Sequence, residues 1–209
     1  MQCPLCHAQP PHLFHKDNKR SYYQCFQCQL IFVPTHERPC IEEEKRIYDQ
    51  HQNNPENKGY CDFLNQLCEP LKKYIHKGAQ GLDFGSGPGP TLSVILEDQG
   101  YQVDLFDALY APDQSVFTKK YDFITATEVF EHLHNPKEEV ERLWRLLKPG
   151  GVLAIMTQHV TDKKSFETWH YIRDPSHVCF YSRTCFDFIA AQLKAKIHHV
   201  HENVVFFIS

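Results

Sequence analysis

The stretch Gly81-Leu82-Asp83-Phe84-Gly85-Ser86-Gly87-Pro88-Gly89-Pro90 decides how this chain is expected to fold. A short apolar run ends in Asp83, and glycines then stand at every second position. Glycine permits backbone angles that a β-carbon forbids, and a helix start offers unpaired N–H groups to a ligand. We therefore expect a strand that turns sharply into a helix beside a bound molecule. The spacing G-x-G-x-G differs from the G-x-G-x-x-G of NAD-binding turns, and a purely structural glycine turn is the alternative.

Outward from this turn, segments of strand and helix character alternate. Pro90 suits the first turn of a helix, and Ser182 suits the N-cap of another that runs to about residue 194. The expected strands are 80–84, 101–107, 121–127, 152–157, 196–201 and 204–208. This alternation predicts an α/β fold, with a mostly parallel sheet covered by helices on both faces. The short connection between the last two strands predicts one antiparallel strand.

Two helices are expected before the glycine stretch. Residues 42–52 begin with an acidic first turn, which suits the helix dipole. Apolar residues recur at helical spacing over 60–75, where Pro70 predicts a kink or a restart and Gly78 a stop.

Four cysteines at the front of the chain form a pattern of their own. Two C-x-x-C pairs are separated by 18 residues: Cys3 with Cys6, and Cys25 with Cys28. Two knuckle turns of this kind supply four thiolates in a tetrahedron, which suits a structural Zn²⁺ ion. The alternative is that the pairs are free or redox active. Residues 1–40 are therefore expected to form a zinc ribbon, and residues 41–209 the main domain.

Composition narrows the class of protein. The chain has 209 residues, 42% hydrophobic and 23% charged, as in ordinary globular proteins. No apolar run approaches the ~20 residues that span a bilayer, and the first residues lack signal-peptide character, so a cytoplasmic protein is expected. The odd count of nine cysteines does not suggest a disulfide framework. The net charge is −4, of which residues 41–209 carry −6, and this argues against an RNA-binding surface.

The succession of motifs along the chain resembles the class I S-adenosylmethionine (SAM) methyltransferases over roughly residues 41–209. The motifs are Asp83-x-Gly85-x-Gly87-x-Gly89, Asp107, Tyr121-Asp122-Phe123-Ile124, Glu128-Val129-Phe130-Glu131-His132-Leu133 and Leu147-Lys148-Pro149-Gly150-Gly151. With its front ribbon, the chain is similar to zinc-ribbon methyltransferases, which include sugar C-methyltransferases. The resemblance implies a Rossmann-like, doubly wound sheet and SAM as the cofactor, with S-adenosylhomocysteine as its product.

The resemblance also implies roles for individual residues. Asp83 would hold the amino group of SAM, and Asp107 would accept both ribose hydroxyls; a solvated strand-end acid is the alternative for Asp107, and Asp104 is its rival. The other implied cofactor residues are Gly85, Ser86, Gly87, Gly89, Thr127 and Glu128. The pair Glu131-His132 is either a scaffold at a helix start or catalytic.

One stretch departs from the family pattern. Tyr121 follows Asp107 by only 14 positions, too few for both a helix and a third strand. We expect the third strand of the family or its helix to be missing or vestigial. The acidic adenine contact that follows this strand in the family is therefore not assigned.

The segment 169–181 is dense in aromatic and ionisable side chains. In the family this region lies over the methyl group, so His177 is the first choice for a general base, since imidazole titrates near neutral pH. His170 is the second choice, and a His177 that only holds the loop is the alternative. The expected substrate contacts are Trp169, Tyr171, Tyr60 and, as an anchor for an anionic group, Arg173. Tyr48 and His51 could help to close the pocket.

These expectations combine into one function. The chain is expected to transfer a methyl group from SAM to an oxygen, nitrogen or activated carbon of a small molecule, without membrane or nucleic-acid partners. The alternatives are an RNA methyltransferase, and a noncatalytic binding module built from the zinc ribbon and a SAM-like fold.

Overall fold

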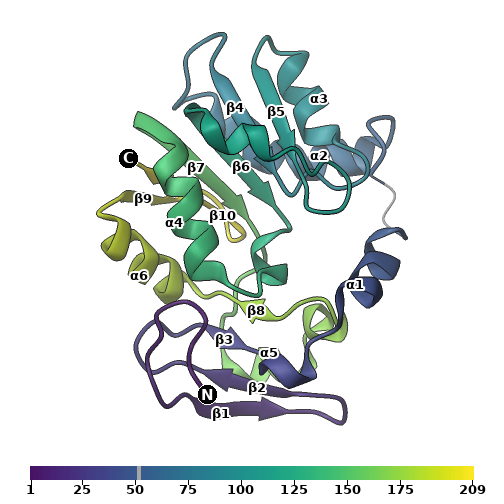
Figure 1. Ribbon diagram of the computed structural model, residues 1–209, viewed down its shortest axis with the longest axis vertical. Coiled ribbons are helices and arrows are strands. Elements are labelled where there is room, and N and C mark those ends of the chain that lie inside the picture. Colours follow the sequence, from purple (N-terminus) through teal and green to yellow (C-terminus); the bar gives the residue numbers. More distant parts are fainter. Residues whose placement is uncertain (51–52) are drawn as a thin grey trace.

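The computed structural model describes residues 1–50 and 53–209. Its main sheet has the strand order β5-β4-β6-β7-β10-β9 in the described part of the chain. The strands are β4 (Gln80–Phe84), β5 (Gln102–Phe106), β6 (Tyr121–Thr127), β7 (Leu147–Met156), β9 (Lys196–His199) and β10 (Val204–Ile208). β4 to β7 pair in parallel, whereas β10 runs antiparallel to both of its neighbours, β7 and β9. The expected α/β sheet with one antiparallel strand is confirmed (Figure 1).

Helices cover both faces of this sheet, as the alternation of buried side chains along β7 requires. Val152, Ala154 and Met156 pack in one core with α2 (Lys58–Leu71) and α3 (Thr91–Glu97). Leu153 and Ile155 face the other core, which contains α4 (Pro136–Leu146) and α6 (Arg183–Leu193). The molecule thus has three layers, and the carboxyl ends of the parallel strands lie at one edge of the central layer (Figure 1).

The shortened stretch after Asp107 contains no strand of the main sheet between β5 and β6, and the structure describes all of residues 107–120. Asp107 forms an isolated bridge with Ala111, and a short 3-10 helix, η2 (Gln114–Thr118), follows. β5 is therefore an edge strand. The expectation that the third family strand or its helix is missing or vestigial is confirmed, and it is the strand that is missing.

A second, small sheet lies at the other end of the molecule. Its order is β1-β2-β3-β8, from β1 (His12–Lys16), β2 (Ser21–Gln24), β3 (Ile31–Phe32) and β8 (Cys179–Phe180). β8 comes from the far end of the sequence and pairs with β3 in antiparallel register, Ile31 opposite Phe180. The front residues share a continuous core with α4 and α6. The N-terminal segment is thus built onto the main domain.

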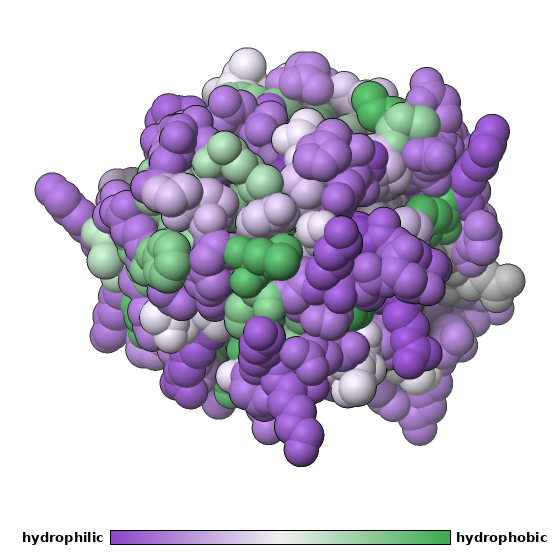
Figure 2. Space-filling view, turned by 90° about the horizontal axis from the view of Figure 1, so that it is seen from below, coloured by the Kyte–Doolittle hydropathy of each residue, from purple (hydrophilic) through white to green (hydrophobic). Residues whose placement is uncertain are grey.

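Figure 2 shows the surface at this end of the molecule, where apolar residues form separate patches among hydrophilic ones. Among the described residues, none of the helices combines the length and the apolar character needed to cross a bilayer.

The front helices differ in detail from the expectation. α1 covers Ile41–Tyr48, and the expected end of this helix at residues 51–52 lies outside the described residues, as does His51. α2 begins after Asn57, whose side chain accepts a hydrogen bond from the backbone N–H of Tyr60 (3.1 Å). Pro70, which has no N–H to donate to the carbonyl of Gln66, lies in its last turn. The helix ends one residue later, at Leu71, rather than continuing to residue 75. Short elements complete the chain: η1 (Thr35–Glu37), η3 (Phe130–His132), α5 (Lys163–Thr168) and η4 (His170–Arg173).

Candidate functional site

A cavity of about 810 Å³ opens at the carboxyl ends of β4, β5 and β6, the edge where doubly wound sheets bind ligands. It brings together most of the residues that the sequence singles out. The predicted residues on its wall are Tyr60, Asp83, Gly85, Ser86, Gly87, Gly89, Asp107, Thr127, Glu128, His170, Tyr171 and His177. Segments more than one hundred positions apart in the sequence thus share one space.

The glycine loop needs its glycines for two different reasons. Gly85 has φ +78°, and a β-carbon there would lie 2.3 Å from Cγ2 of Val129. Gly87 also has a positive φ of +64°. A β-carbon at Gly89 would lie 2.1 Å from the backbone oxygen of Asn53, so the chain before α2 packs directly on the loop. The backbone therefore approaches both the cavity and its neighbours closely.

Asp107 ties the glycine loop to the turn after β5. Its Oδ2 accepts from the backbone N–H of Gly87 (3.0 Å), and its Oδ1 accepts from those of Leu109 (2.8 Å) and Tyr110 (3.0 Å). An ionised carboxylate offers about four acceptor positions, so capacity for a ligand donor remains. The side chain predicted to hold ribose hydroxyls thus also shapes the loop.

Three carboxyl groups were assigned to SAM from the sequence, and that of Asp83 is the most deeply buried of them. Its side chain is 4% exposed and accepts from the hydroxyl of Thr125 (2.9 Å). Burial, together with the nearby charge of Asp107, raises the pKa of Asp83 to about 6, against the effect of the Thr125 bond. A ligand cation beside Asp83 would stabilise the ionised form.

Glu128 marks the end of β6 with a strained backbone. It has φ +52°, and its N–H bonds to the carbonyl oxygen of Met156 (2.8 Å). Burial and then the neighbouring charge of Glu131 raise the pKa of Glu128 to about 9. The Tyr171 hydroxyl lies between the two carboxyl groups: it donates to Glu131 and is 3.3 Å from Oε2 of Glu128. Backbone strain of this kind persists only where surrounding contacts stabilise it, and strained residues are common at functional sites.

Several buried polar atoms of the cavity wall have no hydrogen-bond partner within the described residues. They are Ser86 Oγ, Thr91 Oγ1, Thr127 Oγ1 and Glu128 Oε1. Buried polar atoms are nearly always paired, so these positions fit a ligand that carries several donors. SAM is such a ligand, with an ammonium group, ribose hydroxyls and an adenine amine, and the residues present fit it.

On the opposite wall, His177 is held in one orientation. Its Nδ1 lies 2.8 Å from the carbonyl oxygen of Tyr171, so Nδ1 carries the proton, and Nε2 lies 3.8 Å from Oδ2 of Asp174. Burial lowers the pKa of His177, which keeps the ring neutral and able to accept a proton. Its ring contacts those of Tyr171 (4.0 Å between centroids) and His132 (4.8 Å).

Tyr48 of α1, which the sequence suggested as a residue that closes the pocket, lines the cavity. Other wall residues had no assigned role in binding: the loop residue Asn53, His132 and Asp174. His132 lies within the Glu128–Leu133 motif, which already suggested a scaffold or a catalytic pair. Nothing in the spacing of residues before α2 indicated that Asn53 meets Gly89.

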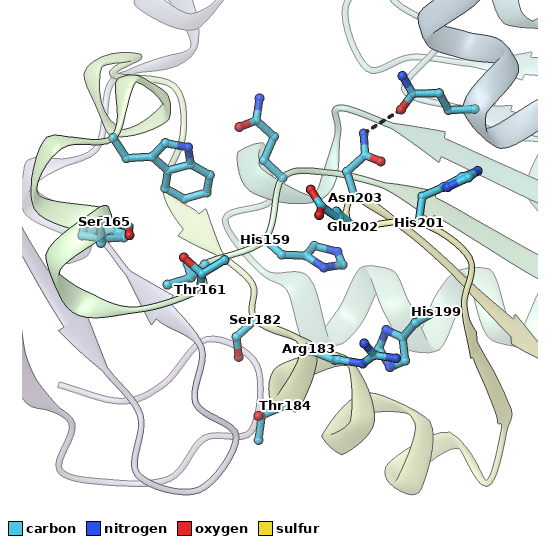
Figure 3. A pocket seen from close by; sticks show the side chains of 15 residues that line it. His159, Thr161, Ser165, Ser182, Arg183, Thr184, His199, His201, Glu202 and Asn203 are labelled. Atoms are coloured by element: carbon cyan, nitrogen blue, oxygen red, sulfur yellow. Dashed lines mark hydrogen bonds between the residues drawn. The ribbon is translucent and has the colours of Figure 1, made fainter.

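Trp169 and Arg173 are not on this wall. Trp169 lines a neighbouring cavity of about 820 Å³, together with His159, Arg183 and His199, and Gln158 belongs to both cavities. Figure 3 shows this neighbouring cavity, where Asn203 bonds to Gln66 (3.3 Å). Arg173, at the end of η4, is exposed and lines neither cavity. Contact of these two side chains with a substrate stays a prediction.

The four predicted metal ligands come together at the front of the chain. Cys3 Sγ lies 3.5 Å from Cys28 Sγ, and Cys6 Sγ lies 3.4 Å from Cys25 Sγ, with the four sulfurs within 4.8 Å of one another. Each C-x-x-C pair is followed by a residue with positive φ, His7 (+63°) and Gln29 (+62°), whose N–H bonds to the carbonyl of the first cysteine. Two matching knuckles fit a tetrahedral Zn²⁺ ion.

Comparisons with known proteins agree with this fold and cavity. The methyltransferase domain family matches residues 50–197, which include the glycine loop and the segment 169–181, and the chain belongs to this family. The class expected from the sequence, a SAM-dependent methyltransferase, is thereby confirmed at the level of family and fold.

Curated relatives cover only part of the chain. The ubiquinone biosynthesis O-methyltransferase of Klebsiella pneumoniae (strain 342) is 31% identical over 77 residues, which cover 37% of this chain and 32% of that protein. Its namesake from Maricaulis maris (strain MCS10) is 30% identical over 101 residues, 46% of this chain and 38% of that protein. The chain therefore spans about a third of the length of these relatives.

Similar solved structures support the fold. A SAM-dependent methyltransferase from Methanosarcina mazei matches with a TM-score of 0.51 at 14% identity, covering 66% of this chain and 94% of that chain. An O-methyltransferase family protein from Burkholderia thailandensis matches with a TM-score of 0.52 at 12% identity, covering 79% of this chain and 61% of that chain.

Proposed function

We propose that this chain transfers a methyl group from SAM to a small molecule, with an oxygen atom as the acceptor. The observation that carries the proposal is the shared cavity of about 810 Å³, which joins the glycine loop and its carboxylates to His177, Tyr171 and Glu128. The names of the partial relatives, ubiquinone biosynthesis O-methyltransferases, favour an oxygen acceptor and a small molecule.

The chain's own residues would hold the cofactor along β4, β5 and β6. Asp83 would accept from the amino group, Asp107 would accept from the ribose hydroxyls, and the backbone of Gly85 to Gly89 would lie against the methionine part. Ser86, Thr127 and Glu128 offer further polar atoms on the same wall. When bound, SAM supplies a methyl group on a positively charged sulfur, which makes the methyl carbon reactive. The main task of the chain is then to align acceptor and methyl group.

His177 would remove the acceptor's proton. Its ring is neutral, its Nε2 carries the lone pair, and the Asp174 carboxylate at 3.8 Å stabilises a proton taken up there. His170, exposed on the same wall, is the second candidate. Tyr60 and Tyr171 would flank the acceptor, and burial raises the pKa of Tyr60 to about 12, so its hydroxyl stays protonated.

The front of the chain would act as a structural support. We propose that residues 1–40 form a zinc ribbon around Cys3, Cys6, Cys25 and Cys28, and that residues 41–209 form the methyltransferase domain. Four thiolates fill a tetrahedral metal shell, which leaves no open position for catalysis at this ion.

Calorimetric titration with S-adenosylhomocysteine tests the proposed function. We expect saturable binding of one equivalent, because Asp83, Asp107 and the glycine loop fit the methionine and ribose parts. Failure of folded, zinc-loaded protein to bind either SAM or S-adenosylhomocysteine would overturn the proposal and favour a noncatalytic module. Methylation of RNA, but not of small phenols or catechols, would support the RNA alternative, against which the charge of −6 over residues 41–209 argues.

A further inference from the structure

A cluster of three ionisable side chains lies beside the cavity, and the proposed mechanism gives a role to only one of them, His177. Glu131, His132 and His177 each place one ligand-type atom within 4.8 Å of the others. His132 and His177 line the cavity, whereas the Glu131 side chain behind them is fully buried. Two imidazoles and one carboxylate thus converge at the position where the acceptor is expected.

The hydrogen bonds of the two rings fix which nitrogen is free. Nδ1 of His132 lies 3.1 Å from the carbonyl oxygen of Ser176, and Nδ1 of His177 lies 2.8 Å from that of Tyr171. A carbonyl oxygen only accepts, so each Nδ1 carries the proton and each Nε2 carries a lone pair. Histidines that bind metals are oriented in this way, with the other ring N–H donated to a backbone carbonyl.

The carboxylate of Glu131 completes the pattern. Its Oε1 accepts from the Tyr171 hydroxyl, but its Oε2 is buried and has no partner within the described residues. Oε1 of the adjacent Glu128 is likewise buried and unpartnered in the described chain. A buried carboxylate oxygen without a donor is costly, and a cation is a partner that would stabilise the carboxyl group of Glu131.

We infer that Glu131, His132 and His177 bind a divalent first-row transition metal ion, which holds the acceptor's hydroxyl oxygen in the cavity. Two imidazole nitrogens and one carboxylate oxygen suit zinc, iron, cobalt or nickel better than the oxygen-only shells of magnesium and calcium. Ligand atoms around one such ion lie at most about 4.2 Å apart, so the cluster would contract by roughly half an ångström on binding. Three protein ligands leave a position open toward the cavity.

This inference rests on the proposed function, and it gives that function a chemical step. A hydroxyl oxygen bound to the ion loses its proton to water more readily, because the ion stabilises the alkoxide or phenolate. The oxygen lone pair then forms the new O–CH₃ bond while the S–CH₃ bond of SAM breaks. The sulfur keeps that electron pair, and S-adenosylhomocysteine leaves uncharged at sulfur. His177, as a ligand, would hold the ion rather than take the proton, which distinguishes this inference from simple general-base catalysis.

Titration of the zinc-loaded chain with Co²⁺ tests the site, read by calorimetry and by the visible absorption of the bound ion. Metal analysis must show that zinc stays at one equivalent, so that the cysteine cluster is not being measured. We expect one further equivalent of Co²⁺ to bind. His132→Ala and His177→Ala should each weaken this binding by at least about 100-fold. Loss of a residue that only hydrogen-bonds to a metal ligand already lowers metal affinity by about 10- to 100-fold. His159→Ala, which removes an imidazole from the neighbouring cavity, should leave it unchanged.

Binding of S-adenosylhomocysteine by each variant separates the possible failures. Glu131 is fully buried, so Glu131→Gln can misfold, and His132, which is partly exposed, supplies the safer variant. Wild-type protein that binds S-adenosylhomocysteine but no extra Co²⁺ overturns the metal site and leaves the proposed function standing. Extra Co²⁺ that binds equally well to both histidine variants overturns it too. Protein that binds Co²⁺ but no S-adenosylhomocysteine overturns the proposed function and leaves the metal site standing.

Discussion

The backbone N–H of Gly87 donates a hydrogen bond to Oδ2 of Asp107 across 3.0 Å, and this bond joins the turn after β4 to the turn after β5. The other oxygen of Asp107 accepts from Leu109 and Tyr110, so one carboxylate organises both turns. Residues 107–120 contain no strand of the main sheet, so the turn after β5 is held to the glycine loop by this carboxylate.

Asp107→Ala should therefore weaken S-adenosylhomocysteine binding and also loosen the glycine loop. Losing hydrogen bonds to a charged acceptor costs about 1–3 kcal/mol, which corresponds to a roughly 5- to 150-fold loss of affinity. Calorimetry measures this loss, and amide hydrogen exchange at residues 85–89 measures the loosening. Asp104→Ala is the matched control, since Asp104 bonds Lys119 and Tyr121 instead (2.7 and 2.9 Å) and should leave the affinity unchanged. The opposite ranking of the two variants would move the ribose role to Asp104.

The raised pKa of Asp83, about 6, predicts how cofactor binding depends on pH. The ammonium group of the ligand binds the ionised carboxylate, so affinity for S-adenosylhomocysteine should fall below about pH 6, by up to about tenfold per pH unit. Above about pH 7 the affinity should be flat. Asp83→Asn should bind weakly and show no such slope.

The same raised pKa has the opposite sign for the stability of the unliganded protein. Between the ordinary value of 3.8 and about 6, the folded chain binds more protons at Asp83 than the unfolded chain, so this group's contribution to stability declines as the pH rises. Denaturant titrations of wild type and Asp83→Asn across that range measure the difference. If affinity rises and stability falls over the same interval, Asp83 is the common cause; a parallel change in both would argue against it.

Gly85→Ala should be more harmful than alanine at an equally left-handed glycine elsewhere. At Gly85 the new β-carbon would lie 2.3 Å from Val129, whereas at Gly78 (φ +73°) nothing lies within 4 Å. Both variants lose about 1 kcal/mol because alanine disfavours positive φ, and Gly85→Ala adds a steric term. The free energy of unfolding measures both. The double variant Gly85→Ala, Val129→Ala should recover part of the steric loss; no recovery would show that the loop fails for another reason.

Parts of the fold and of the site that depend on neighbouring residues could be predicted from the sequence, whereas parts that depend on contacts between distant segments could not. Asp83, Gly85 and Gly87 are examples of the first kind. A strand end, a turn and a positive φ depend on neighbouring residues, and all three residues line the cavity as their spacing predicted. The short stretch after Asp107 also showed that a strand and a helix could not both fit, although it did not show which of the two is missing.

Distant contacts could not be foreseen in this way. β8 has only Cys179 and Phe180, too short a segment for a period-two pattern, and its pairing with β3 depends on tertiary packing. Trp169 illustrates the reverse case: its ring contacts that of Tyr171 (4.8 Å between centroids), yet Trp169 lines the neighbouring cavity and Tyr171 the main one.

The pairing of β8 with β3 predicts that loss of zinc will affect His177, because Cys25 and Cys28 lie between β2 and β3 and His177 stands two residues before β8. Arg20 strengthens this connection: its guanidinium donates to the carbonyl oxygens of Ile172 (2.8 Å), Asp174 (2.6 Å) and Pro175 (2.8 Å). Because metal binding supplies folding energy to small ribbons, removing zinc should free this anchor and the segment it holds. Hydrogen exchange over residues 172–180 should therefore accelerate in Cys25→Ser, while exchange within β4 changes little.

Arg20→Ala separates this anchor from the metal itself. It should retain one zinc per chain, yet accelerate exchange over residues 172–180 and lower the methylation rate with little change in S-adenosylhomocysteine affinity, because the cofactor wall lies on β4, β5 and β6. Cys40→Ser, which removes an exposed cysteine outside the cluster, should match wild type in zinc content and in exchange. If residues 172–180 exchange at the wild-type rate in both Cys25→Ser and Arg20→Ala, the ribbon does not position His177, and the shared sheet would serve stability alone.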